Sequence, residues 1–188
     1  MITEIINYFN SLEQHPVQRL AILVSGLLFF WAVEGAIPLY KLNYKKNKLS
    51  HAGLNFIFTV IHLAIHSVLA VVIILISDWC RTNHFGLVYW LNAGVAGSIV
   101  IAFLTLDFFG GWLVHIVEHK IPLLWRFHVI HHADNKVDVT TGLRHHPGES
   151  ILRGLFFFAG ILVAGAPMYA VMIFQTVLVF ATAFTHAN

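Results

Sequence analysis

The sequence contains little charge and almost no cysteine. Only 11% of its 188 residues are charged and 58% are hydrophobic, whereas soluble domains carry about 25% charged residues, so we expect a membrane protein. Cys80 is the only cysteine, which excludes an intrachain disulfide and argues against a thiolate metal site. The formal net charge of +2 is too small to indicate nucleic-acid binding. Histidine, in contrast, is abundant, with 13 residues against 11 Lys plus Arg.

Long apolar segments predict an all-α fold, an integral-membrane helical bundle that forms a single domain over residues 1–188. A membrane-crossing helix needs about 20 mostly apolar residues. The segments that satisfy this requirement are 20–39, 53–77, 86–106 and 155–184. We therefore expect about four transmembrane helices, and favour a hairpin broken at residues 165–167 over one steep helix in the last segment. Apolar residues at helical spacing in the first 12 positions predict a short interfacial helix.

Basic residues predict the orientation of these spans. Four lysines lie in residues 41–48 and five Lys or Arg in residues 115–153, which is nine of the eleven in the chain. Two predicted spans separate these stretches, so both lie on one side of the membrane, and the positive-inside rule makes that side cytoplasmic. The histidine-rich region 107–150 should therefore form a cytoplasmic helical cap.

Five histidines in this region fall at helical spacing. They form H-x-x-x-H and then H-x-x-H-H, and they are His115, His119, His128, His131 and His132. Residues three or four apart share one face of a helix, and a turn at Pro122 would bring two short helices side by side. We expect the five imidazoles to converge on a metal such as Fe, Zn, Cu or Ni. Zinc metalloprotease chemistry is excluded, because HIVEH lacks the glutamate directly after its first histidine.

The competing interpretation of these five histidines is a cationic surface that binds lipid headgroups. Histidines are mostly neutral near pH 7, however, and would bind such headgroups poorly. Metal-bound histidines donate their second N–H to a carboxylate or carbonyl. Candidates by proximity in the sequence are Asp107, Glu118, Asp134, Asp138 and Glu149.

The run from Asp107 to Glu149 resembles the fatty acid hydroxylase/sterol desaturase superfamily of integral-membrane di-iron oxygenases. The shared features are H-x-x-x-H, LWRFH-x-x-HH-x-D and D-V-T-T-G-L-R-x-H-P. Glu34 and Pro38 in the first span also fit. By this resemblance the iron ligands would be His115, His119, His128, His131, His132, His146 and His186. His145, Asp107, Asp134 and Asp138 are further candidates, as ligands or as hydrogen-bond partners of ligands.

The resemblance implies two irons that activate O2 and a membrane-embedded lipid substrate, such as a sterol or a fatty acyl chain. The family's last H-x-x-H-H has no counterpart before Asn188, so we expect a C-terminally truncated member. No dinucleotide-binding fingerprint is present. Reducing equivalents should therefore come from an external partner, a small cytochrome or a ferredoxin.

His62 and His66 form another H-x-x-x-H, inside the second span. Intramembrane ionisable residues are costly and commonly functional. Three interpretations stay open for this pair: lining of a substrate cavity, haem ligation, and interior histidines with ordinary hydrogen bonds.

The sequence thus favours an O2-dependent di-iron lipid hydroxylase or desaturase. The alternative is a catalytically inactive membrane protein that keeps a partial metal site and has a structural or regulatory role.

Overall fold

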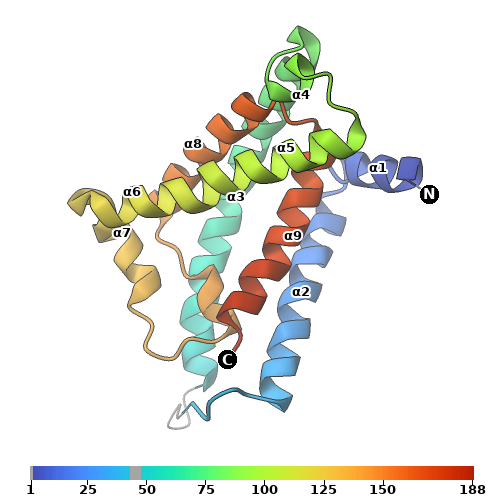
Figure 1. Ribbon diagram of the computed structural model, residues 1–188. Helices are drawn as coiled ribbons and strands as arrows, with labels where there is room; N and C mark the ends of the chain where they lie inside the picture. Colours follow the sequence, from blue (N-terminus) through green and yellow to red (C-terminus); the bar gives the residue numbers. More distant parts are fainter. Residues whose placement is uncertain (1, 43–47) are drawn as a thin grey trace.

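The structure is a computed structural model that describes residues 2–42 and 48–188. Over these residues the chain forms helices and no strand, which confirms the predicted all-α fold (Figure 1). The α-helices are α1 (Ile2–Ser11), α2 (Pro16–Ala36), α3 (Lys48–Asn83), α4 (Leu87–Trp90), α5 (Val95–Asp107), α6 (Val114–Lys120), α7 (Pro122–His132), α8 (Pro147–Ala164) and α9 (Met168–His186). A π-helix, η1 (Phe108–Leu113), joins α5 to α6, and a 3-10 helix, η2 (Val139–Leu143), lies between α7 and α8.

Five helical stretches of the described chain are long and apolar enough to cross a membrane. They are Pro16–Ala36, Leu49–Trp90, Val95–Lys120, Pro147–Ala164 and Met168–His186. The last two form the hairpin predicted from the sequence, with its turn at residues 165–167. Large apolar side chains such as Phe29, Phe56 and Val68 are exposed on the outer faces of these helices, which suits contact with lipid.

The turn between α8 and α9 depends on a close backbone contact. Gly165 ends α8 in the left-handed conformation, with φ +66, which is accessible to glycine at little cost. A Cβ on Gly165 would lie 2.2 Å from the carbonyl oxygen of Phe85. The end of α3 and the α8–α9 turn therefore fit together only when glycine occupies this position.

The third span begins later than the sequence predicts. Instead of one helix over residues 86–106, the short helix α4 and a turn come first, and α5 begins at Val95. Positive φ angles at Gly86 (+104) and Asn92 (+47) interrupt the helix there. From Val95 the helix continues through η1 to Lys120.

Helix α8 occupies the middle of the bundle. It packs against α3 and α5, while α9 packs against α1, α2 and α5. The glycines of α8 allow close approach, because a Cβ on Gly154 would lie 2.5 Å from Leu69 Cδ1. The main apolar core comes from these helices and includes Ile73, Leu106, Ile161, Val171 and Phe174.

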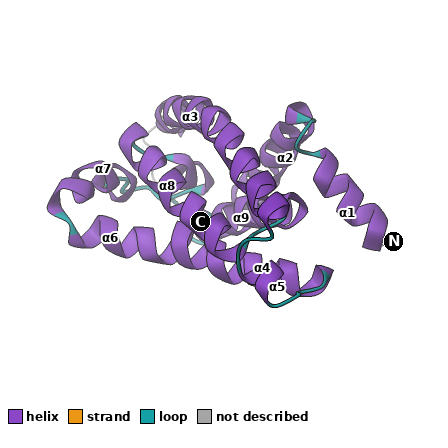
Figure 2. Ribbon diagram, turned by 90° about the horizontal axis from the view of Figure 1, so that it is seen from above, coloured by secondary structure: helices purple, strands orange, loops and turns teal. Residues whose placement is uncertain are grey.

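The predicted N-terminal helix is present as α1. Leu12, just after it, is buried against the core, whereas Ile2 and Ile5 are exposed. Figure 2 shows α1 projecting from one side of the bundle, with α6 and α7 on the opposite side. The interfacial position of α1 stays a prediction.

The elements on either side of the lysine-rich stretch 41–48 lie near the loop after α7 and the C-terminus, and residues 43–47 of that stretch lie outside the described residues. His51 Nε2, at the start of α3, lies 2.9 Å from both carboxylate oxygens of Asp134 in the loop after α7. Tyr40, after α2, exchanges two hydrogen bonds with Asn188, of 3.0 and 2.7 Å. The C-terminus therefore lies beside the end of α2 (Figure 1).

Candidate metal centre

The histidine-bearing helices α6 and α7 form a tight hairpin. Ile121 between them has an extended backbone (φ −98, ψ 114), as expected for a residue before proline. Pro122 takes the first position of α7, where its missing N–H costs nothing. The sharp turn that the sequence predicts at Pro122 is thus present, and it sets α6 and α7 against each other.

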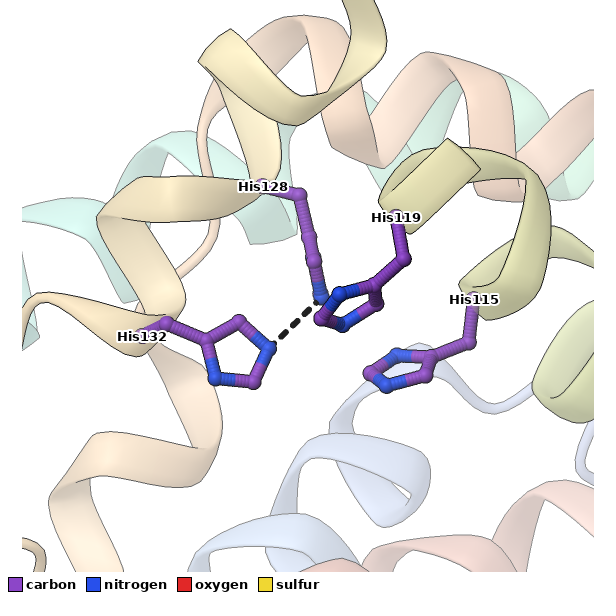
Figure 3. Close-up of side chains that lie close together, drawn as sticks. All are labelled: His115, His119, His128 and His132. Atoms are coloured by element: carbon purple, nitrogen blue, oxygen red, sulfur yellow. Dashed lines mark hydrogen bonds between the residues drawn. The ribbon is translucent and has the colours of Figure 1, made fainter. Parts of the chain in front are cut away.

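Four imidazoles meet between these two helices. His115 and His119 come from α6, and His128 and His132 from α7 (Figure 3). One ring nitrogen of each lies within 4.8 Å of one nitrogen of every other. His128 Nε2 and His132 Nε2 lie 3.0 Å apart. These residues are called the α6–α7 group below.

Two carboxylates lie behind His128, which is fully buried. Its Nδ1 donates to Glu149 Oε1 at 2.9 Å and lies 3.5 Å from Glu118 Oε2. Arg153 connects the two acids, because its Nε donates to Glu149 at 3.0 Å and its Nη2 to Glu118 at 2.7 Å. Of the five acidic candidates considered, Glu118 and Glu149 are the ones placed beside a histidine of this group, as hydrogen-bonded partners of metal ligands usually are.

His131 does not join the four, although five imidazoles were expected to converge. Its neighbours are His145, stacked nearly parallel (5°) at a ring distance of 5.0 Å, and His186, at 5.2 Å. The Nε2 atoms of His131 and His186 lie 3.4 Å apart. Adjacent residues on a helix point about 100° apart, which separates His131 from His132. His131, His145 and His186 are called the His131 group below.

The other sequence candidates lie outside both groups. His146 precedes α8; its Nδ1 accepts from the Gly148 N–H at 3.0 Å and its ring stacks on Phe127 at 4.7 Å. Asp107 is exposed, two helical turns before His115. Asp134 and Asp138 both face His51, with shortest distances of 2.9 and 3.3 Å. As ligands these four residues stay predictions.

Asp138 and Glu34 instead hold the loop that carries His145. Asp138 caps η2 by accepting from the Thr140 N–H at 2.8 Å. Glu34, buried in α2, accepts from the Val139 N–H at 2.9 Å. A Cβ on Gly142 would lie 3.1 Å from His186 Nδ1, so η2 lies directly against that histidine.

His62 and His66 extend the His131 group into α3. Their rings lie 4.0 Å apart, and His62 lies 5.5 Å from His145. His62 Nδ1 is also 2.9 Å from Ser150 Oγ. Two hollows, of about 380 and 300 Å³, border α4 rather than these histidines. A substrate cavity at His62 and His66 therefore stays a prediction.

The electrostatic surroundings favour neutral imidazoles. Burial, together with neighbouring histidines, lowers the pKa of His131 from 6.5 to about 3. Burial and the nearby His128 also lower the pKa of His132. For Asp134, burial opposes ionisation, but hydrogen bonds from His51 and Thr141 outweigh it and lower the pKa. A metal needs the neutral form of histidine, and the lowered pKa of His132 favours that form at this member of the α6–α7 group.

Sequence reasoning missed the role of Arg153. It counted this residue only as a cytoplasmic positive charge, whereas in the structure Arg153 lies among buried acids. The available signal was its spacing, because Arg153 follows Glu149 by four residues, which places both on one face if the segment is helical; the predicted helix began only at residue 155, whereas α8 begins at Pro147. Its contact with Glu118 joins helices 35 positions apart and leaves no pattern in the sequence.

Sequence comparison finds similarity to lipid hydroxylases. Residues 99–188 match the model of the fatty acid hydroxylase family. The ornithine lipid hydroxylase OlsE of Rhizobium tropici is 25% identical over 100 residues, which are 53% of this chain and 30% of that protein. The chain therefore covers less than a third of the length of this relative. No solved structure matches the chain.

Proposed function

Because the chain is a multi-pass membrane protein that belongs to the fatty acid hydroxylase/sterol desaturase superfamily, we propose that it oxidises a membrane lipid with O2 and two irons. The observation that carries this proposal is the α6–α7 group, four imidazoles with ring nitrogens within 4.8 Å of one another. The His131 group would hold the second metal. Bound iron would supply the activation of O2 that removal of hydrogen from an unactivated C–H bond requires.

The residues of the chain would prepare this site in two ways. The neutral imidazoles offer lone pairs to a metal without the cost of first losing a proton. Glu149 accepts a hydrogen bond from the buried ring of His128, and Arg153 keeps Glu149 and the neighbouring Glu118 in place. Such hydrogen-bonded partners fix the orientation of ligands and support metal affinity.

Apolar side chains beside the histidines support a lipid substrate. Trp125 lies 5.0 Å from His119 and 5.6 Å from His132, ring to ring. Trp112 in η1, next to α6, and Leu123 in α7 are 56% and 61% exposed. A lipid chain could approach the α6–α7 group along this surface without leaving an apolar environment.

An electron-transfer partner would dock at the turn between α6 and α7. His119 and His132 are exposed, and so are Lys120 and Arg126 close by. Positive charge around the open side of the site would attract an acidic carrier, such as a small cytochrome or ferredoxin. By the positive-inside rule this face would be cytoplasmic.

Metal content per chain tests the proposal. Protein purified in mild detergent from iron-supplemented cells should contain close to two irons, and His128→Ala should lose metal. His84→Asn is the matched control, because His84 lies in the turn before α4 at φ 52, which asparagine tolerates. One zinc or no metal in the unmodified chain would contradict the proposal and favour an inactive protein with a partial site.

A further inference from the structure

A single carboxylate oxygen contacts both histidine groups. Glu149 Oε1 lies 2.9 Å from His128 Nδ1, in the α6–α7 group, and 2.8 Å from His145 Nδ1, in the His131 group. Glu149 is fully buried, in the first turn of α8. Its position between the groups follows from the fold, because α8 packs against α7, which carries His128, and His145 precedes Glu149 by four residues at the start of α8.

These contacts define which nitrogen of each ring carries the proton. Arg153 Nε also donates to Glu149 Oε1, at 3.0 Å, so this oxygen accepts three hydrogen bonds as a carboxylate. The protons must then reside on Nδ1 of His128 and of His145. A neutral imidazole has one N–H, so both rings present the lone pair of Nε2. For His128 this is the nitrogen that faces His132, at 3.0 Å.

Glu118 cannot replace Glu149 in this role. Its Oε2 accepts from Arg153 at 2.7 Å and lies 3.5 Å from His128 Nδ1, beyond the usual range of an N–H···O bond. Glu118 also contacts histidines of the α6–α7 group alone in the described structure, whereas Glu149 reaches both groups.

We propose that Glu149 is a positioning residue shared by the two histidine groups, which fixes His128 and His145 together as Nδ1-protonated ligands that offer Nε2. The consequence for metal binding rests on the proposed function. Loss of this one carboxylate should release the rings of both groups, whereas loss of Glu118 should affect the α6–α7 group alone.

The tautomers can be measured without metal or substrate. In metal-free protein in detergent, with ¹⁵N-labelled histidine, NMR of the ring nitrogens should show His128 and His145 protonated at Nδ1, with the signals assigned from His128→Asn and His145→Asn. In Glu149→Leu both rings should shift toward protonation at Nε2, while Glu118→Gln should leave His145 unchanged. Unchanged tautomers of both rings in Glu149→Leu would overturn the proposal.

A second variant covers the case in which Glu149→Leu does not fold. Glu149→Asp keeps the charge next to Arg153 but withdraws the carboxylate by one methylene, so both histidine signals should again change. Zinc content of the loaded protein gives the second readout: both Glu149 variants should hold less zinc than Glu118→Gln. Equal zinc in all three would overturn the positioning role. Absence of zinc from the unmodified chain would contradict the proposed function instead, and the tautomers would still decide the role of Glu149.

Discussion

Replacing Arg153 with alanine should destabilise the protein strongly. The side chain is 21% exposed and pairs with two acids whose side chains are 1% and 0% exposed, Glu118 and Glu149. Removal of one partner from a buried ion pair costs about 3–5 kcal/mol, because the charge that remains is uncompensated. At about 2–4 °C per kcal/mol for a chain of this size, the melting temperature should fall by roughly 6–20 °C. Tryptophan fluorescence during heating in detergent would measure this change.

The matched control is Arg81→Ala. Arg81 also pairs with an acid, Asp78, but these side chains are 69% and 60% exposed. An exposed pair contributes about 0–1 kcal/mol, so this variant should melt within a few degrees of the unmodified chain. A similar small shift for Arg153→Ala would refute the view that Arg153 neutralises buried acids. Arg153→Lys tests the geometry, because a lysine ammonium lacks the planar fork that spans two carboxylates.

Three further predictions concern glycines and pH. Gly165→Ala should lower the free energy of unfolding by more than the about 1–2 kcal/mol that a left-handed residue usually costs, because the added Cβ would also lie 2.2 Å from the backbone oxygen of Phe85. Gly53→Ala, whose added Cβ would have no neighbour within 4 Å, should leave the melting temperature unchanged. Gly142→Ala would place a Cβ 3.1 Å from His186 Nδ1; it should lower the metal content, and unchanged content would place His186 outside the site. Because burial holds the pKa of His131 near 3 rather than 6.5, the unfolded chain takes up protons first as pH falls. The contribution of His131 to the stability of the metal-free protein should be constant above about pH 6.5 and decrease below it by up to about 1.4 kcal/mol per pH unit, and His132, whose pKa is also lowered, adds to the decrease. Equal melting temperatures at pH 7.5 and 5 would contradict this.

The helical fold could be predicted because hydrophobic length alone determines whether a segment can cross a membrane. The break at Gly165 could also be predicted, since glycine and proline interrupt helices locally. The start of the third span could not. Nothing in its apolar composition shows that Asn92 takes a positive φ, because that conformation depends on how the preceding turn packs.

The site was predictable where it is local. Helical spacing correctly paired His115 with His119 and His128 with His132. It could not show that His131 would face His145 and His186, because that contact joins the end of α7 to the last residue of α9. The roles of Glu149 and Arg153 depend equally on the packing of α8, which follows from the whole bundle.

The π-helix η1 has a consequence for insertions and deletions in this chain. Such a segment contains one residue more than an α-helix needs over the same length, and η1 lies between the packed helix α5 and the histidines of α6. Deletion of Gly111 would let this segment revert to α-helical geometry over the same length, so His115 and His119 would keep their direction toward α7. A one-residue deletion inside α6, between His115 and His119, has no extra residue to absorb it and would turn His119 by about 100° away from His115, although every histidine is still present. The effect of a one-residue deletion in this helix therefore depends on whether it falls inside η1.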